Sequence, residues 1–92
     1  MTPAHLVMPR ALAVVLRNAP LSPEKVAFAW RMAVGPALDK ASDVELRRDV
    51  LLVRAKDAAW QREIERSVAL IRSRLTDLLG EHVVRYIDVK RR

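Results

Sequence analysis

The chain has 92 residues, of which 51% are hydrophobic and 30% are charged, and this balance excludes disorder along most of a single small domain. The absence of cysteine excludes disulfides and thiolate metal sites, and we expect a cytoplasmic location. The net charge of +6 favours a polyanionic partner, such as nucleic acid or an acidic protein surface, although arginine-favouring codon usage would produce the same charge.

The first predicted element is a short helix over about residues 9–18, which Asn18, Ala19 and Pro20 end. Its apolar run, residues 11–16, is shorter than a secretory signal or a membrane span, so we expect no contact with a membrane. Apolar side chains here could instead bury against a second copy or another protein. The candidates for that contact are Leu6, Val7, Leu12, Val15 and Leu16.

A second helix is predicted to begin at the sequence "SPEK". Ser22 is a suitable N-cap and Pro23 a suitable first helical residue. Gly35 followed by Pro36 predicts the end of this helix. The residues that fall on one apolar face at helical spacing are Val26, Ala29, Trp30, Ala33 and Val34.

The pattern changes to alternation after Val44 and predicts a β-hairpin. Its strands cover residues 44–47 and 50–56, and Arg48 and Asp49 form the connection, which lacks the usual glycine. Leu51, Val53 and Ala55 share one face of the second strand.

One long amphipathic helix is predicted over about residues 58–79, ended by Gly80, and a third strand over residues 83–90. The expected order is α-α-β-β-α-β in an α+β fold, a three-stranded sheet with helices on one face. We expect one domain over residues 1–92, with a loose N-terminus and a short basic C-terminal end. The apolar stripe of the long helix contains Trp60, Ile64, Val68, Ile71, Leu75 and Leu78.

Three segments together resemble the DciA family. They are "WRMAVG" at residues 30–35, "VLLVRAKDAAW" at 50–60 and "LTDLLGEHVVRYIDV" at 75–89, and the resemblance covers about residues 29–89. The chain departs from the family pattern at Ala33, at Thr76 and Asp77, and at the hairpin turn, where glycine is usual. Many relatives also carry polar or basic extensions that are missing from this sequence, so contacts made through such extensions are not carried over to it.

The resemblance implies a bacterial replication factor that associates with the DnaB-type replicative helicase and helps to load it on DNA. It also implies a domain similar to the K homology (KH) fold. KH domains bind nucleic acid through a Gly-x-x-Gly loop, and the glycines of this chain are Gly35 and Gly80 alone. Any contact with DNA is therefore expected to come from basic side chains and to be weak and electrostatic.

Basic residues near the strands are the first candidates for that contact, and Tyr86 is a candidate for stacking on a base or touching a partner. The last three residues could equally be a solvated tail. The predicted nucleic-acid-binding residues are Arg54, Lys56, Tyr86, Lys90, Arg91 and Arg92.

Arg62 and Arg66 are the predicted contacts with the helicase, because they lie four residues apart on the outer face of the long helix with no acidic residue between them on that stripe. Tolerance of two solvated arginines is the alternative. Trp30 and Trp60 could stack on bases, but their apolar stripes favour the core. The predicted structural core comprises Trp30, Val34, Gly35, Leu51, Val53, Trp60, Ile64, Leu75, Gly80 and Ile87.

Catalysis has little support, because His5 and His82 lie far apart in the sequence and no catalytic motif accompanies either. We therefore expect no enzyme activity, no metal and no cofactor. The predicted function is a non-enzymatic adaptor that binds the replicative helicase and DNA. An autonomous basic nucleic-acid-binding protein and a structural interaction module are the alternatives, and the oligomeric state stays open.

Overall fold

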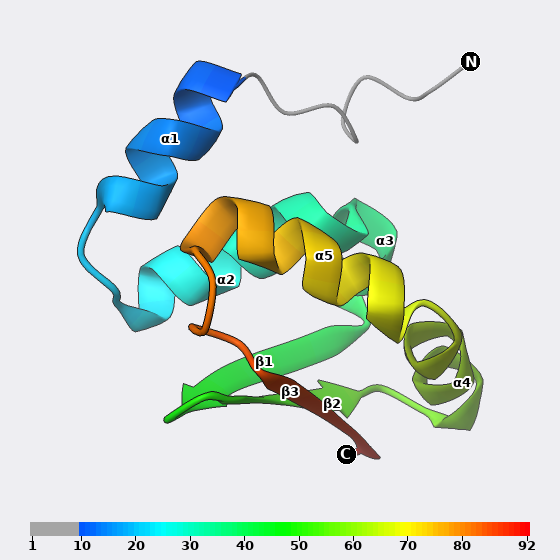
Figure 1. Cartoon of the computed structure of the whole chain (residues 1–92). Helices are drawn as coiled ribbons and strands as arrows, with labels where there is room; N and C mark the ends of the chain where they lie inside the picture. Colours follow the sequence, from blue (N-terminus) through cyan, green and yellow to red (C-terminus); the bar gives the residue numbers. More distant parts are fainter. Residues whose placement is uncertain (1–9) are drawn as a thin grey trace.

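The computed structural model describes residues 10–92, which form five helices and three strands (Figure 1). Pro9, Leu6, Val7 and His5 lie outside the described residues, as does the side chain of Leu12. In chain order the elements are α1 (Arg10–Asn18), α2 (Pro23–Val34), α3 (Pro36–Lys40), β1 (Ser42–Arg47), β2 (Val50–Ala55), α4 (Ala58–Arg66), α5 (Val68–Leu79) and β3 (Tyr86–Arg91).

The three strands form one mixed sheet in the order β1-β2-β3. β1 and β2 pair antiparallel, whereas β2 and β3 pair parallel. Figure 1 shows α2, α3 and α5 over one face of this sheet, while α4 lies at one end of it. No described element covers the opposite face, so the expected α+β fold with helices on one side of a three-stranded sheet is confirmed.

The hydrophobic core lies between the sheet and the helices. Leu51, Val53 and Ala55 supply its floor from β2, and each is at most 1% exposed. Trp30 from α2 is buried to the same degree above them. The other buried apolar side chains of this cluster are Val26, Ala29, Ala33, Ile64, Ile71, Leu75, Leu78, Leu79 and Val84.

The predicted start and end of α2 are confirmed in atomic detail. The Oγ of Ser22 accepts a hydrogen bond of 3.1 Å from the backbone N–H of Lys25. At the other end Gly35 has φ +86°, and its N–H donates to the carbonyl of Arg31. Glycine tolerates this positive φ because it has no Cβ.

α3 was not expected, because Pro36 was interpreted only as a helix stop. In the structure Pro36 is instead the first residue of α3, a position where proline loses no helical hydrogen bond. Gly35 therefore ends one helix and begins the next.

The prediction of one helix over residues 58–79 was wrong. The chain bends at Ser67 into α4 and α5, and the Ser67 N–H turns back to the carbonyl of Ile64. α4 packs against β2 and β3, whereas α5 packs against α1 and α2. The two parts of the predicted helix therefore run along different axes. Each half keeps its own apolar period, and for this reason the sequence pattern did not reveal the bend.

The strands also differ from their predicted bounds. β1 begins two residues earlier than expected, at Ser42, and β3 begins at Tyr86 rather than at residue 83. Val83 and Val84 precede β3 and pack on the core. In the hairpin turn Arg48 adopts φ +56°, the conformation that glycine usually takes there.

Two basic side chains attach α1 to the rest of the molecule. The buried ammonium of Lys25 donates to the carbonyl oxygens of Ala19 (2.6 Å) and Arg17 (3.1 Å) at the end of α1. The guanidinium of Arg17 donates in turn to the carbonyl of Asp77 in α5 at 3.0 Å. Carbonyls at a helix end carry partial negative charge, so both cations have favourable positions.

Candidate nucleic-acid and partner surfaces

The uncovered face of the sheet, which we call the outer sheet face, gathers several of the predicted nucleic-acid-binding residues. The strand register places Arg54 of β2 between Asp43 of β1 and Lys90 of β3. It likewise places Val50 between Arg47 and Tyr86. The full outer sheet face consists of Asp43, Glu45, Arg47, Val50, Leu52, Arg54, Tyr86, Asp88 and Lys90.

Acidic side chains on the outer sheet face pair with cations beside them. Glu45 accepts a hydrogen bond of 2.9 Å from Arg47, and Asp88 lies 3.8 Å from the ammonium of Lys90. The hydrogen bond from Arg47 is the main cause that lowers the pKa of Glu45, and the positive charge of Arg47 is the next. The positive charge of Arg54 lowers this pKa further. Arg54 is exposed and forms no ion pair with another described residue. It is therefore available to an anion that approaches this face.

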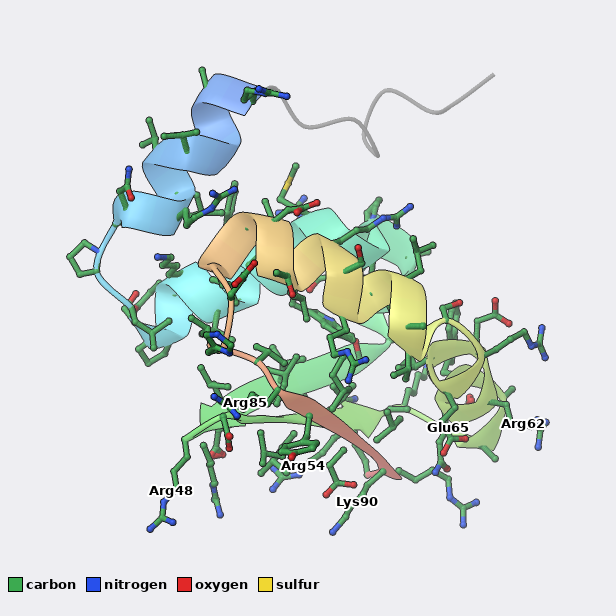
Figure 2. The ribbon with its side chains drawn as sticks, in the orientation of Figure 1. Arg48, Arg54, Arg62, Glu65, Arg85 and Lys90 are labelled. Carbon is green, nitrogen blue, oxygen red and sulfur yellow. The ribbon has the colours of Figure 1, made fainter. Side chains whose placement is uncertain are left out.

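Tyr86 offers an aromatic surface on the same face. It is 62% exposed, and its neighbour across the strands, Val50, is half-buried. An exposed ring with apolar and cationic neighbours can stack on a nucleic-acid base or fill a partner's pocket. Figure 2 shows Arg48, Arg54 and Lys90 extending from this side of the sheet. Arg48 was absent from the predicted site, although its turn position places it beside the strand ends.

The C-terminal end is more ordered than either predicted form, a flexible contact or a solvated tail. Lys90 and Arg91 belong to β3, and the N–H of Arg92 donates to the carbonyl of Ala55 at 2.9 Å. The Arg92 guanidinium also pairs with Asp43 at 2.6 Å.

Strand alternation separates these C-terminal residues. Arg91 lies opposite Ala55 on the helix side of the sheet, away from Lys90. Lys56, which directly follows β2, is exposed, and its N–H donates to the carbonyl of Ala41. The register thus brings Arg54, Tyr86 and Lys90 to one face and leaves Arg91 on the other.

The predicted partner contacts lie on α4, apart from the outer sheet face. Arg62 and Arg66 are both exposed, and Figure 2 shows Arg62 pointing away from the sheet. The expectation that no acidic residue serves this stripe was wrong for Arg66, which forms an ion pair of 3.3 Å with Glu63 one turn earlier. That i, i+3 pair removes the like-charge strain on which the prediction rested.

Two further arginines are engaged in holding helices and loops in place. The guanidinium of Arg74 donates at 2.8 Å to the carbonyl of Ala33 near the end of α2. Arg72 donates at 3.3 Å to the carbonyl of Arg85, just before β3. Part of the positive charge therefore stabilises the fold, and the net charge alone overstates the surface available to a polyanion.

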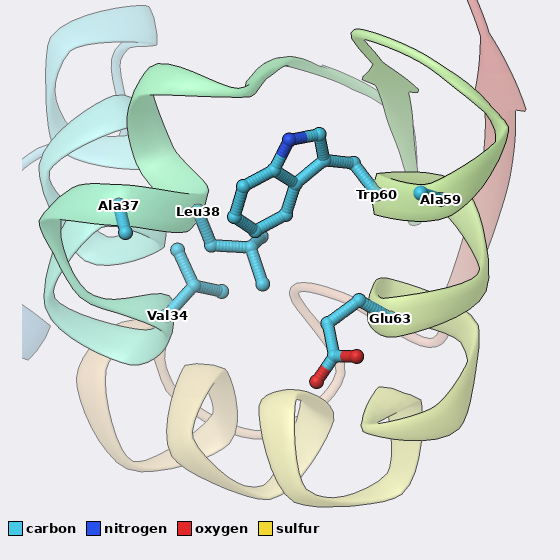
Figure 3. A pocket seen from close by; sticks show the side chains of 6 residues that line it. All are labelled: Val34, Ala37, Leu38, Ala59, Trp60 and Glu63. Atoms are coloured by element: carbon cyan, nitrogen blue, oxygen red, sulfur yellow. The ribbon is translucent and has the colours of Figure 1, made fainter.

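An apolar groove lies between α3 and α4 (Figure 3). It has a volume of about 500 Å³, and the partly exposed indole of Trp60 forms one side of it. Trp60 was expected wholly inside the core, but it is half-buried and only packs against the core's edge. The lining residues are Val34, Ala37, Leu38, Ala59, Trp60 and Glu63.

The remaining predicted core residues vary in burial. Ile64 and Leu75 are at most 1% exposed, like Trp30, Leu51 and Val53. Val34 and Ile87 are half-buried against the core. Gly80 ends α5 with φ +99°, which again requires the conformational freedom of glycine.

Neither a metal centre nor a membrane span emerges from the described residues. Within residues 10–92 no three histidine or acidic side chains gather as metal ligands would. His82 is exposed in a turn, with Glu81 at 4.0 Å. None of the described helices combines the length and apolar character needed to cross a bilayer.

Comparison with protein families decides the classification. The sequence model of the family described as "Dna[CI] antecedent, DciA" matches residues 7–89, nearly the whole chain. The chain belongs to the DciA family. DciA proteins are loaders associated with the replicative helicase and not a catalytic family. No curated protein and no solved structure matches this DciA chain, so its predicted likeness to KH domains stays a prediction.

Proposed function

We propose that this DciA chain is a non-enzymatic adaptor that binds the bacterial replicative helicase in the cytoplasm and assists its loading on DNA. The family match over residues 7–89 carries this proposal. Exposed basic side chains on α4 and on the outer sheet face support it, because they lie on two separate surfaces of the small domain. One surface can then bind the helicase while the other binds DNA.

We assign the helicase contact to α4, around Arg62 and Arg66. Both side chains are exposed, and the same helix lines the apolar groove with Ala59, Trp60 and Glu63, the last of which pairs with Arg66. Protein interfaces combine an apolar centre with a charged rim that contains arginine. Glu63 partly neutralises the charge of Arg66, whereas Arg62 forms no ion pair with another described residue. Arg62 is therefore the more available of the two cations.

We assign the DNA contact to the outer sheet face, with Arg54 and Lys90 as phosphate contacts and Tyr86 as a stacking residue. Exposed Lys56 follows β2 and adds a further cation near this face, whereas Arg92 is paired with Asp43 and Arg91 lies on the helix side of the sheet. Because Arg47, Lys90 and Arg92 are already paired with acidic residues, phosphate groups must compete for them, and DNA binding should be weak. DNA and helicase are the partners of this proposal, and no cofactor or metal takes part.

The test is a nuclease-treated binding titration between the purified replicative helicase of the same source and the chain. The variant Arg62→Glu with Arg66→Glu should lose at least tenfold in affinity while its melting temperature stays within about 2 °C of the parent's. The matched control, Arg10→Glu with Arg31→Glu, makes the same change in net charge on exposed residues of α1 and α2, away from the groove, and should bind like the parent.

Three outcomes would contradict parts of the proposal. Equal affinity of the α4 variant and the parent would remove α4 as the contact. Equal losses in both variants would replace a specific contact with general charge attraction. A parent chain that binds no helicase but does bind DNA would favour the autonomous nucleic-acid-binding protein instead.

A further inference from the structure

β3 stands at one edge of the sheet, and no further described strand pairs with its far side. A strand edge exposes backbone donors and acceptors that can pair with another strand. β3 is a regular six-residue strand, YIDVKR, that contains no proline and pairs with β2 without interruption. Its charged residues Asp88, Lys90 and Arg91 are of the kind that discourages unspecific pairing at an edge. The edge is therefore available to a strand whose charges complement them.

Hydrogen bonds identify which backbone groups of β3 face outward. The N–H groups of Tyr86 and Arg92 both donate toward β2, to the carbonyls of Asp49 and Ala55. Backbone direction alternates along a strand, so the even-numbered residues bond to β2 and the odd-numbered ones point to the free edge. The outward groups belong to Ile87, Val89 and Arg91.

An antiparallel partner strand must pair with these odd-numbered positions. When the partner is a second copy of β3, two registers pair five residues of each strand, one centred on Asp88 and one on Val89. The register centred on Asp88 places two identical carboxylates opposite each other, which is unfavourable. The register centred on Val89 instead places Asp88 opposite Lys90 of the other copy, twice by symmetry.

The favourable register also fits the hydrogen-bonding pattern. Val89 lies opposite Val89 of the second copy, and Ile87 lies opposite Arg91 of the second copy. The outward backbone groups of the two strands can therefore form hydrogen bonds with each other. Asp88 and Lys90 then occupy the non-hydrogen-bonded positions, where facing side chains lie closest. We propose that β3 binds β3 of a second copy in this register, forming a two-fold symmetric dimer with one continuous sheet.

β1, the other edge strand, does not offer an equivalent self-pairing. The N–H of Lys56 bonds to the carbonyl of Ala41, so alternation directs the even-numbered residues of β1 outward. One of its two five-residue registers places Asp43 opposite Glu45 twice, and the other places Glu45 opposite itself between two Asp43–Arg47 pairs. Both β1 registers therefore contain a like-charge pair, whereas the β3 register centred on Val89 contains none, and this distinguishes β3 from β1 as the dimer edge.

A pair of charge-reversal variants tests the register directly. Asp88→Lys gives a strand with two lysines, and Lys90→Asp gives one with two aspartates, so each alone should repel its own copy. The dimer dissociation constant of each variant should rise about tenfold or more, measured by analytical ultracentrifugation at low salt. An equimolar mixture should restore the dimer, because both cross-strand pairs become complementary again. Glu65→Lys, an exposed change of the same size on α4, should leave the parent dimer intact.

Hydrogen exchange of the parent provides a second test that needs no variant. On raising the protein concentration, the amides of Val89 and Arg91 should gain protection, while those of Asp88 and Lys90 are already protected by β2. A parent protein that stays monomeric at millimolar concentration would overturn the proposal. It would do so even if the β3 edge binds a strand of another protein. A dimer that persists in both charge variants would place the interface elsewhere and equally overturn it.

Discussion

The indole Nε1 of Trp30 donates a buried hydrogen bond of 3.0 Å to the Oγ of Ser42. That hydroxyl donates onward to the carbonyl of Leu38 at 2.7 Å. The relay joins α2, the first residue of β1 and the short helix α3. It satisfies the one polar atom of an indole that is only 1% exposed. The relay thus fixes the angle at which the chain enters the sheet.

Trp30→Phe should keep most of the apolar packing and lose this hydrogen bond. We expect a loss of about 1–3 kcal/mol in the free energy of unfolding, because a ring of lower volume also leaves a small cavity. Trp30→Ala should cost about 3–5 kcal/mol. Denaturant unfolding measures both. In a double-mutant cycle with Ser42→Ala, additive losses would contradict an energetic coupling between the two residues.

Trp60→Ala should cost less than Trp30→Ala, about 2 kcal/mol, because Trp60 is half-buried at the edge of the groove. The same unfolding experiment measures the difference between the two variants. A loss as large as that of Trp30→Ala would show that Trp60 belongs to the core as fully as the sequence predicted.

The sequence predicted features that depend on neighbouring residues alone. Ser22 as N-cap and Gly35 as helix end follow from local backbone chemistry, and the alternation around Val53 follows from strand geometry. The bend at Ser67 depends instead on two helices packing in different directions, which no local pattern encodes.

The candidate surfaces were predictable only in part, for the same reason. Alternation within β2 placed Arg54 opposite the buried face, but the position of Arg91 depends on where β3 begins and how it pairs with β2. The carbonyl contacts of Lys25 and Arg74 join segments that are not neighbours in the sequence. Without the fold, these cations were indistinguishable from free surface charge.

Lys25→Met should weaken the attachment of α1, because it removes the ammonium that binds the carbonyls of Arg17 and Ala19. We expect a loss of about 1–3 kcal/mol in stability, since these partly buried carbonyls lose a charged donor. Amide hydrogen exchange should accelerate in α1 more than in β2. Unchanged exchange in α1 would show that apolar contacts alone hold this helix.

DNA affinity should fall steeply with salt, because the release of counterions from phosphates drives electrostatic binding. Arg54→Ala should lower the affinity and reduce the slope of log K against log salt by roughly 1, the value for one lost phosphate contact. Arg31→Ala, which removes an exposed cation from α2, is the matched control. If both variants bind equally and with the parent's slope, the outer sheet face is not the DNA surface.

Tyr86→Ala should lower the affinity for single-stranded DNA with little change in the salt slope, because stacking involves no phosphate neutralisation. The expected loss is about 1–3 kcal/mol for one stacked base. Tyr86→Phe keeps the ring and should bind like the parent. Equal binding by the alanine variant, measured by fluorescence anisotropy, would leave Tyr86 to a partner contact or to solvent.

A loading assay tests whether this DciA chain assists helicase loading. Purified replicative helicase is incubated with circular single-stranded DNA, with and without the chain, and the helicase retained on the DNA after a high-salt wash is quantified. We expect several times more retained helicase with the parent chain, and little increase with the Arg62→Glu, Arg66→Glu variant. If the amount of retained helicase is the same with and without the parent chain, this protein is not a helicase loader.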